Sequence, residues 1–153
     1  MSAKNKFKKV LFSFLILAPD FSGLADEILL TERNGVYIVP VTLNDSITVD
    51  GILDTGASEM FIPFNVIATL IQSTSIAMKD ILKEGVYTLA DGSINTKERV
   101  NIEKIVIGDT TFYNISAIVG AKNSQLLIGQ NLLHTFDSYG IDNNRKILTL
   151  NNK

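Results

Sequence analysis

Short runs in which apolar and polar residues alternate recur along most of the chain. Val36–Leu43 and Ile47–Leu53 are two such runs, and the turn-forming pair Asn44-Asp45 lies between them. Alternation with a period of two is typical of strands that bury one face, so this stretch predicts a β-hairpin. The same reasoning predicts three further hairpins: Val86–Leu89 and Ile94–Val100 around Asp91-Gly92, Ile102–Ile107 and Phe112–Val119 around Gly108-Asp109, and Tyr139–Ile141 and Lys146–Leu150 around Asp142-Asn143-Asn144.

Two segments depart from this pattern. In Ile62–Gln72 the apolar residues recur at helical spacing, and Pro63 suits the first position of a helix, so a helix is expected there. Asn131–Phe136 predicts one or two further helical turns, shortly after a short apolar strand at Leu126–Ile128. Many short strands with one or two short helices are typical of an all-β sandwich or barrel.

A weak internal repeat is also visible. Val36–Gly56 contains a strand, a polar turn, a second strand and then Ile-Leu-Asp-Thr-Gly. Ile102–Gly129 contains a strand, a Gly-Asp turn, a second strand, a loop and then Leu-Leu-Ile-Gly. From spacing alone, a true repeat and a chance likeness between two hairpins are equally open.

The first 25 residues have the three-part pattern of a secretory signal peptide. A basic head with four lysines precedes the apolar run Val10–Ala18, Pro19 ends this run, and Gly23-Leu24-Ala25 offers small residues for cleavage. The run is well short of the ~20 apolar residues that a membrane-spanning helix needs. We therefore expect residues 1–25 to be removed, residues 26–153 to form the mature domain, and the protein to be exported, either periplasmic or secreted. An uncleaved leader that anchors the domain to a membrane through residues 10–18 is the alternative.

The amino-acid composition excludes several kinds of active and binding site. With 153 residues, 46% of them hydrophobic and 20% charged, the chain suits one globular domain. It has no cysteine and a single histidine, which excludes a disulfide framework, a zinc–thiolate site, a cysteine nucleophile and a multi-histidine metal site. We expect no metal and no cofactor. The net charge of −2 argues against nucleic-acid binding; without the leader, 14 basic residues fall to 10 and 16 acidic residues to 15, which gives −5.

The segment Asp54-Thr55-Gly56-Ala57-Ser58 carries the candidate chemistry. An aspartate directly after a buried strand costs free energy unless it is hydrogen-bonded or functional. Thr55 supplies a hydroxyl, and Gly56 allows a sharp turn and a close approach to a ligand. Ala57 and Ser58 are small and leave room for a substrate. Taken alone, Asp-Thr-Gly also occurs as a plain turn.

Three motifs in this order resemble the retropepsin-like aspartic proteases, which are half-size, single-motif relatives of pepsin. They are Asp54–Ser58 after an apolar strand, Thr88–Gly92 at the tip of an expected hairpin, and Leu126–Leu133 further along the chain. The resemblance covers about Tyr37 to Leu150, and the second motif is similar to that of secreted bacterial members. It implies a closed, mainly antiparallel acid-protease β-barrel and an aspartic-type endopeptidase. It also implies roles for the matching residues: Asp54 catalytic, Thr55 and Gly56 supporting the catalytic loop, and Ala57, Ser58, Ala90, Asp91 and Gly92 contacting substrate.

The chemistry of this family requires two aspartates about 3 Å apart that share one proton. One carboxylate acts as a base toward water, while the protonated one polarises the peptide carbonyl. The chain has one Asp-Thr-Gly, and the second half of the repeat has Ile128-Gly129 where another would be needed. The resemblance therefore implies a homodimer that acts on peptide or protein substrates, with one Asp54 from each copy. A secreted barrel that binds peptides without cutting them is the alternative.

The sequence departs from the retroviral members at two positions. Ser58 and Gln130 stand where those relatives have an acidic residue and an arginine that form an ion pair. Both positions are neutral here, so no unpaired charge is buried. This departure puts the retroviral dimer contacts in doubt, but not the expected role of Asp54. We expect Tyr87 to pack within a strand and His134 to be a partly exposed helical residue rather than a catalytic one.

Overall fold

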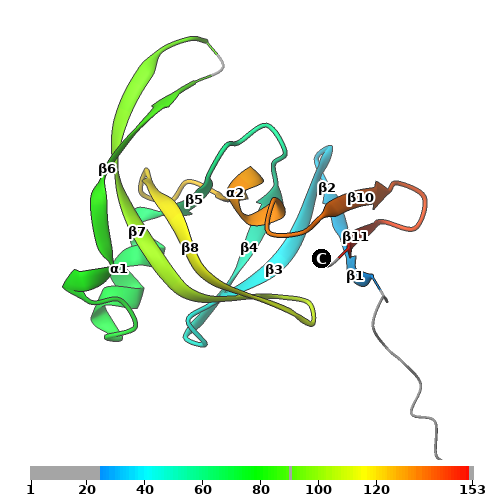
Figure 1. The fold of residues 1–153 in the computed structure, drawn as a ribbon, viewed down its shortest axis with the longest axis horizontal. Coiled ribbons are helices and arrows are strands. Elements are labelled where there is room, and N and C mark those ends of the chain that lie inside the picture. The colour runs from blue at the N-terminus through cyan, green and yellow to red at the C-terminus, as the bar shows by residue number, and fades with distance from the viewer. Residues whose placement is uncertain (1–24, 90, 152–153) are drawn as a thin grey trace, which may run out of the picture.

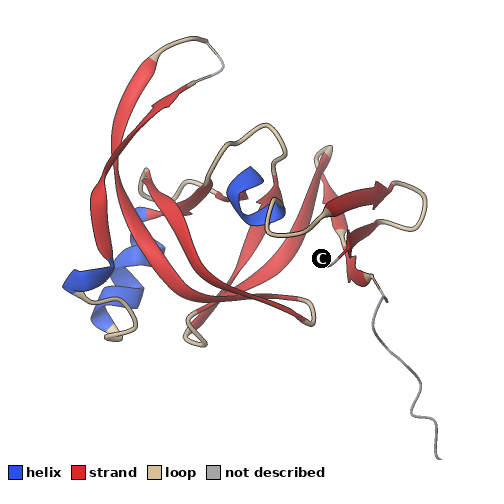
Figure 2. Cartoon of the chain, in the orientation of Figure 1, coloured by secondary structure: helices blue, strands red, loops and turns tan. Residues whose placement is uncertain are grey.

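The computed structural model describes residues 25–89 and 91–151. The predicted leader, apart from Ala25, and Ala90 therefore lie outside the described residues, and the leader and its cleavage stay predictions. None of the helices in the described part is long and apolar enough to cross a membrane. The elements (Figure 1, Figure 2) are β1 (Asp26–Leu29), β2 (Thr31–Arg33), β3 (Val36–Leu43), β4 (Ile47–Leu53), β5 (Met60–Pro63), α1 (Phe64–Gln72), a 3-10 turn (Met78–Asp80), β6 (Ile81–Thr88), β7 (Ile94–Ile107), β8 (Thr110–Gly120), β9 (Leu126–Ile128), α2 (Gln130–Leu133), β10 (Ser138–Asp142) and β11 (Ile147–Asn151).

Six strands close into a barrel because each of them pairs with two others. Round the ring the order is β3, β4, β9, β5, β8 and β7, and β7 returns to β3 through antiparallel pairs such as Val41↔Ile107. β2 pairs with β3 outside the ring, and β6 pairs with β7 to form a long hairpin that projects from the barrel (Figure 1). The predicted closed, mainly antiparallel β-barrel with one or two short helices is confirmed, and the structure has two, α1 and α2.

The barrel is filled by branched apolar side chains. In β3, the inward-pointing Val39, Val41 and Leu43 are at most 2% exposed, as expected for a strand with one buried face. Leu70 of α1 and Leu132 of α2 belong to the same buried cluster, so each helix is held by the face that it packs on the barrel. Burial of one such side chain stabilises the fold by about 1.5–3 kcal/mol relative to exposure.

The internal repeat is present in the pairing of the strands. The pattern is unchanged when β3, β4 and β5 are exchanged with β7, β8 and β9: the two hairpins correspond, and the parallel pair β4–β9 corresponds to β8–β5. The end of the repeat differs from the one expected from the sequence. Ile128 ends β9 and Gly129 follows it, so Ile128-Gly129 matches the end of β5 and not the end of β4. The counterpart of the segment after β4 is the loop of residues 121–125, which contains no Asp or Glu.

The two ends of the described chain meet in a separate three-stranded sheet. β11 lies between β1 and β10 and pairs with both in antiparallel register; Leu148, for example, lies opposite Ile28 and Ile141. Within the described residues, neither β1 nor β10 has a strand on its outer side, and Leu29 of β1 is 73% exposed. Unpaired strand edges are surfaces on which another chain can add.

The prediction of a helix over Ile62–Gln72 is wrong at its start. Ile62 and Pro63 end β5, which pairs in parallel with β8 through Ile62↔Val119, and α1 begins at Phe64. Pro63 has an extended ψ of 142° and precedes the helix instead of opening its first turn. A short apolar run suits either element, and here the pairing with β8 decides in favour of a strand.

Other boundaries also differ from the predictions. β7 is continuous where the sequence predicted a break at Asn101, because Asn101 stays in the ladder opposite Ser116. β6 begins at Ile81 instead of Val86, since it pairs along the whole outer half of β7. α2 begins and ends earlier than predicted, and the short strands β1 and β2 were not predicted.

Candidate active site

Asp54 follows β4 directly and opens the loop of residues 54–59, called the Asp54 loop below. Its backbone N–H donates to the Ile128 carbonyl at 3.1 Å, which continues the parallel pairing of β4 with β9. Its Oδ1 accepts a hydrogen bond from the Gly56 N–H at 3.0 Å, and a Cβ on residue 56 would lie only 3.3 Å from that oxygen. Asp54 is half-buried as a residue, its backbone is bound to β9, and one backbone N–H hydrogen bond orients its carboxylate.

The segment around Gly129 supports the Asp54 loop. The first two amides of α2, those of Gln130 and Asn131, donate to the carbonyls of Ala57 and Ser58 at 2.8 and 3.1 Å. Gly129 lies so close that a Cβ on it would come within 2.3 Å of the Glu59 carbonyl oxygen. Two motifs that lie far apart in the sequence are thus in direct backbone contact.

Gly129→Ala is expected to destabilise the fold by at least about 2 kcal/mol, because the added methyl group meets backbone that cannot rotate away. Urea or thermal unfolding measures this loss. Gly140→Ala is the matched control, since a Cβ at Gly140 has nothing within 4 Å. Equal unfolding midpoints for the two variants would show that the loop yields and does not need glycine at position 129.

Gln130 binds the Asp54 loop through its side chain as well. Its Nε2 donates to the Thr55 carbonyl at 2.7 Å and to the Tyr139 hydroxyl of β10 at 3.0 Å. In the described chain no side-chain hydrogen bond joins Gln130 to Ser58, and Ser58 is exposed, as is Thr55. Gln130 therefore connects the Asp54 loop to the sheet formed by the chain ends, without the charge that the retroviral arginine carries.

The hairpin β6–β7 ends in a tight turn where the sequence predicted one. Thr88 pairs with Ile94; beyond this pair the Leu89 N–H donates to the Ser93 carbonyl and the Gly92 N–H to the Leu89 carbonyl, both at 2.9 Å. Gly92 has φ +82°, which places it in the left-handed region that glycine adopts without strain. We call residues 86–96 the flap.

Asp91 is part of this turn. Its Oδ1 accepts a hydrogen bond from the Ser93 N–H at 2.9 Å, and this bond lowers the pKa of the Asp91 carboxyl below its ordinary value. The ionised form that accepts the bond therefore stays populated in moderately acidic solution. Contact of Asp91 and Gly92 with a substrate stays a prediction, and Ala90 lies outside the described residues.

A pocket of about 310 Å³ lies between the base of the flap and β9. Leu127 lines this pocket and lies opposite Ile52 of β4. Asp54 comes two residues after Ile52, so the Leu127 wall is about 7 Å from Asp54, measured along the direction of the strand. Its other lining residues are Phe61, Tyr87, Lys97, Gly120, Ala121, Ser124 and Gln125.

Aromatic residues form one side of this pocket. Phe61 and Tyr87 pack edge to face with their ring centroids 5.5 Å apart. Tyr87 thus packs as expected and also lines the pocket, while Phe61 and Lys97 were not among the sequence candidates. Lys97 lies two residues from Asn95, and Asn95 is opposite Tyr87, so Lys97 and Tyr87 are on the same face of the hairpin. This spacing is the only feature of the sequence that could have pointed to Lys97.

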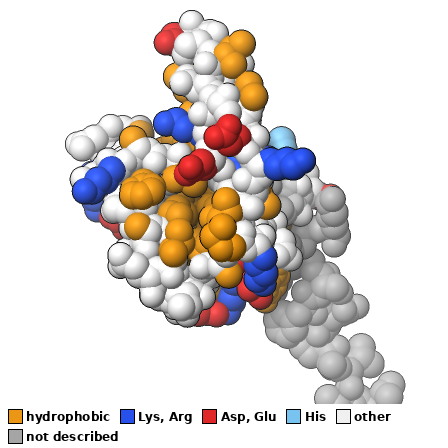
Figure 3. Space-filling model, turned by 90° about the vertical axis from the view of Figure 1, so that its left-hand side faces the viewer, with side chains coloured by type: hydrophobic (Ala, Val, Ile, Leu, Met, Phe, Trp, Pro, Cys, Tyr) orange, Lys and Arg blue, Asp and Glu red, His pale blue; other side chains and the backbone are white. Residues whose placement is uncertain are grey.

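Exposed apolar side chains occur on the flap and on α1. Val86 and Ile94 are 71% and 72% exposed, and Phe64 of α1 is 50% exposed. Figure 3 shows apolar side chains gathered on this side of the molecule, below the projecting hairpin. β6 pairs only with β7 in the described sheet, so the flap is joined to the barrel through its base.

His134 directly follows α2 instead of lying within a helix, and it is exposed instead of partly exposed, so the expected position is corrected. That His134 takes no part in the chemistry stays a prediction. Within the described residues, no three His, Cys, Asp or Glu side chains are placed to share a metal ion.

Comparison with known proteins assigns the chain to a family. The sequence profile of the family described as "gag-polyprotein putative aspartyl protease" matches residues 39–135, which include the Asp54 loop, the flap and Gly129. The chain belongs to this aspartyl protease family. A solved structure of a retropepsin-like aspartic protease from Rickettsia conorii is 26% identical in sequence and similar in fold, with a TM-score of 0.61. The match covers 86% of this chain and 94% of that chain. A search of curated protein sequences finds no match.

For this aspartyl protease, the retropepsin-like family and the acid-protease fold predicted from the motifs are confirmed. The general function of the family is that of an aspartyl protease, which is a hydrolase. The homodimer, the role of each site residue and the substrate stay predictions.

Proposed function

We propose that this aspartyl protease is an endopeptidase whose active site forms between two copies of the chain, each contributing one Asp54. The observation that carries the proposal is the carboxylate of Asp54, which accepts the Gly56 N–H at 3.0 Å at the end of β4, the strand that pairs with the pocket-lining β9. The corresponding loop of residues 121–125 has no Asp or Glu, so the two halves of one barrel do not supply a pair.

The proposed reaction is the addition of water to a peptide carbonyl. With two Asp54 carboxylates about 3 Å apart, one proton is shared, because both cannot ionise at that distance. The ionised carboxylate takes a proton from water, the water oxygen attacks the carbonyl carbon, and the protonated carboxyl gives its proton to the carbonyl oxygen. The carboxyl that took a proton from water then gives it to the amide nitrogen, and one hydroxyl of the tetrahedral intermediate returns its proton to the other carboxylate. The C–N bond breaks to leave the acid and the amine, and the pair again holds one shared proton.

Exposed edges favour a second copy of the chain as the partner. Thr55 and Gly56 of the Asp54 loop are exposed, so another copy can approach this loop. The outer edges of β1 and β10 are unpaired among the described residues, and Leu29 on β1 presents an apolar side chain there. A two-fold axis beside Asp54 would bring the same surfaces of both copies together.

The proposed substrate is an extended peptide that lies between the flap and the Asp54 loop. Ala57 and Ser58 on one side and the backbone of Ala90–Gly92 on the other would contact its main chain. One substrate side chain would enter the pocket beside Phe61 and Tyr87, whose rings favour an apolar or aromatic group.

Hydrolysis is expected to have a bell-shaped pH dependence with an optimum on the acidic side of neutral. The pair is active only with one proton, so the rate falls both where it holds two and where it holds none. Initial rates on a mixed peptide library, for residues 26–153 from about pH 3 to about pH 9, test this. Circular dichroism at each pH serves as the control for folding. A rate that climbs steadily into alkaline solution would contradict the carboxylate mechanism.

A further inference from the structure

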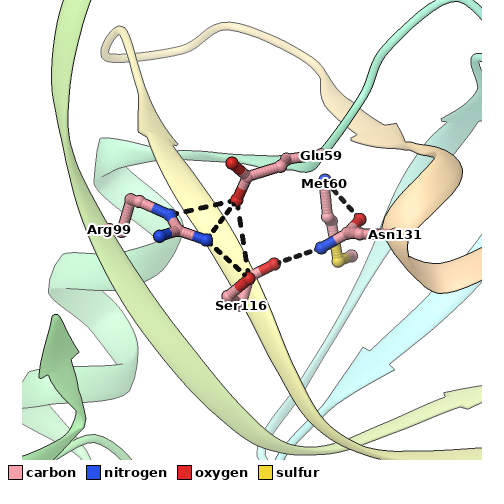
Figure 4. A network of polar contacts seen from close by, with 5 residues as sticks. All are labelled: Glu59, Met60, Arg99, Ser116 and Asn131. Atoms are coloured by element: carbon pink, nitrogen blue, oxygen red, sulfur yellow. Dashed lines mark hydrogen bonds and ion pairs between the residues drawn. The ribbon is translucent and has the colours of Figure 1, made fainter. Parts of the chain in front are cut away.

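A cluster of polar side chains joins the Asp54 loop to the strand that carries the flap (Figure 4). Glu59, the last residue of the Asp54 loop, accepts on Oε2 two hydrogen bonds from Arg99 of β7, from Nε at 3.0 Å and from Nη2 at 2.7 Å. The same Nη2 donates to the Ser116 hydroxyl of β8 at 3.0 Å. The side chains of Arg99 and Glu59 are only 29% and 24% exposed, so water screens this ion pair less than a surface pair.

The cluster continues to the helix that supports the Asp54 loop. Asn131 of α2 accepts the Met60 N–H at 2.8 Å on Oδ1 and donates from Nδ2 to the Ser116 carbonyl at 2.7 Å. Because Met60 follows Glu59 in the chain, these contacts form a closed circuit through Arg99, Ser116 and Asn131 (Figure 4). The hydrogen bond from Met60 to Asn131 therefore holds the backbone next to Glu59, so Arg99 binds a residue whose own position is fixed.

Arg99 stands where the flap-bearing hairpin leaves the barrel. Arg99↔Ile118 is the last pair between β7 and β8 on the flap side, so beyond it β7 pairs only with β6. Arg99 also lies opposite Leu82, next to a β-bulge between Leu82 and Gly85. Its side chain passes over Gly85, where a Cβ would come within 2.5 Å of the Arg99 Cδ. A bulge bends the strand that contains it, so this is the point at which the hairpin can change its angle.

We propose that Arg99 is a positioning residue: through its ion pair with Glu59 it fixes the base of the hairpin against the Asp54 loop and so sets the angle of the flap over the substrate. The proposal rests on the proposed peptidase function for its effect on kinetics. The coupling of the flap to the Asp54 loop is a property of the folded chain alone, and it can be measured without catalysis.

Loss of the ion pair has a distinct kinetic consequence. Without it the hairpin pivots at the bulge, and the closed arrangement becomes a smaller fraction of the molecules. The apparent affinity for substrate falls in proportion to the fraction of molecules with a closed flap. The chemistry at Asp54 is unchanged once the flap has closed. KM should therefore rise while kcat stays nearly constant.

The test compares five variants with the parent protein: Arg99→Met, Arg99→Lys, Glu59→Gln, the double variant Glu59→Gln with Arg99→Met, and the control Lys104→Met. Arg99→Met removes the charge and the donors but keeps the aliphatic stem that passes over Gly85, and Glu59→Gln removes the charge of the partner. Lys104→Met is the matched control. Lys104 also lies on β7, toward the end of the strand away from the flap, and forms an ion pair with Asp45 at 2.9 Å. The readouts are amide hydrogen exchange of the flap, and KM and kcat on one peptide.

For Arg99→Met we expect flap amides to exchange about five- to tenfold faster and KM to rise by a similar factor, with kcat within about twofold of the parent. Glu59→Gln should act in the same direction, Arg99→Lys should be intermediate, and the double variant Glu59→Gln with Arg99→Met should be no worse than Arg99→Met alone. Lys104→Met should match the parent in both readouts.

Three results would overturn the proposal. They are parental flap exchange in Arg99→Met, a fall in kcat with unchanged KM, and fully additive effects of the two substitutions. If the parent cleaves no peptide, the proposed function fails, and the exchange data alone still decide whether Arg99 controls the flap.

Discussion

Asp54→Asn is expected to abolish peptide hydrolysis, with a loss of at least about a thousandfold, while the barrel stays folded. The asparagine keeps an oxygen that can accept the Gly56 N–H now bound at 3.0 Å, and the backbone bond to the Ile128 carbonyl is untouched. What it loses is the ability to take a proton from water or to share one with a second carboxylate. The local structure is therefore retained and the acid–base chemistry is removed.

The measurement is kcat/KM on the best peptide from the library, with unfolding midpoints measured in parallel. Asp50→Asn is the matched control: Asp50 lies four residues earlier, on β4, is exposed, and pairs with Arg33 at 3.5 Å. It should cleave at the parental rate. A folded Asp54→Asn protein that cleaves as fast as the parent would show that Asp54 is not the catalytic group.

Local features of the sequence predicted the hairpins well because turn chemistry and alternation act over a few residues. Asn44 and Asp45 adopt φ of 48° and 51° in the turn between β3 and β4, as this pair suggested. The position of Asp54 after an apolar strand was equally local. The order of the motifs was enough to identify the family before any contact between them was known.

Features that depend on distant pairing could not be predicted in this way. The start of α1 depends on β5 pairing with β8, and the repeat was misaligned because sequence spacing does not show that β9 corresponds to β5. Arg99 and Glu59 are 40 residues apart, and each alone looks like an ordinary surface charge. Only the closed barrel reveals that they meet beneath the flap.

The second large effect concerns assembly. If each active site needs Asp54 from two chains, activity per chain must fall on dilution below the dimer dissociation constant. The two halves of one barrel offer no substitute, because the loop that corresponds to the Asp54 loop carries no carboxylate. Activity measured over a wide range of protein concentration, at constant substrate, tests this dependence.

Mixing the parent with an excess of Asp54→Asn is the sharper form of the test. With freely exchanging subunits of equal affinity, a tenfold excess of the variant leaves only about a tenth of the parent chains in parental dimers. The other parent chains are in heterodimers with a single carboxylate, so activity per parent chain should fall about tenfold. An equal excess of Asp50→Asn is the control, and it should raise total activity because that variant brings its own Asp54. A peptide-binding barrel without catalysis would show no activity to inhibit in either mixture. Activity that stays proportional to the parent chains, at every dilution and mixing ratio, would place a complete site within one subunit and exclude the dimeric mechanism.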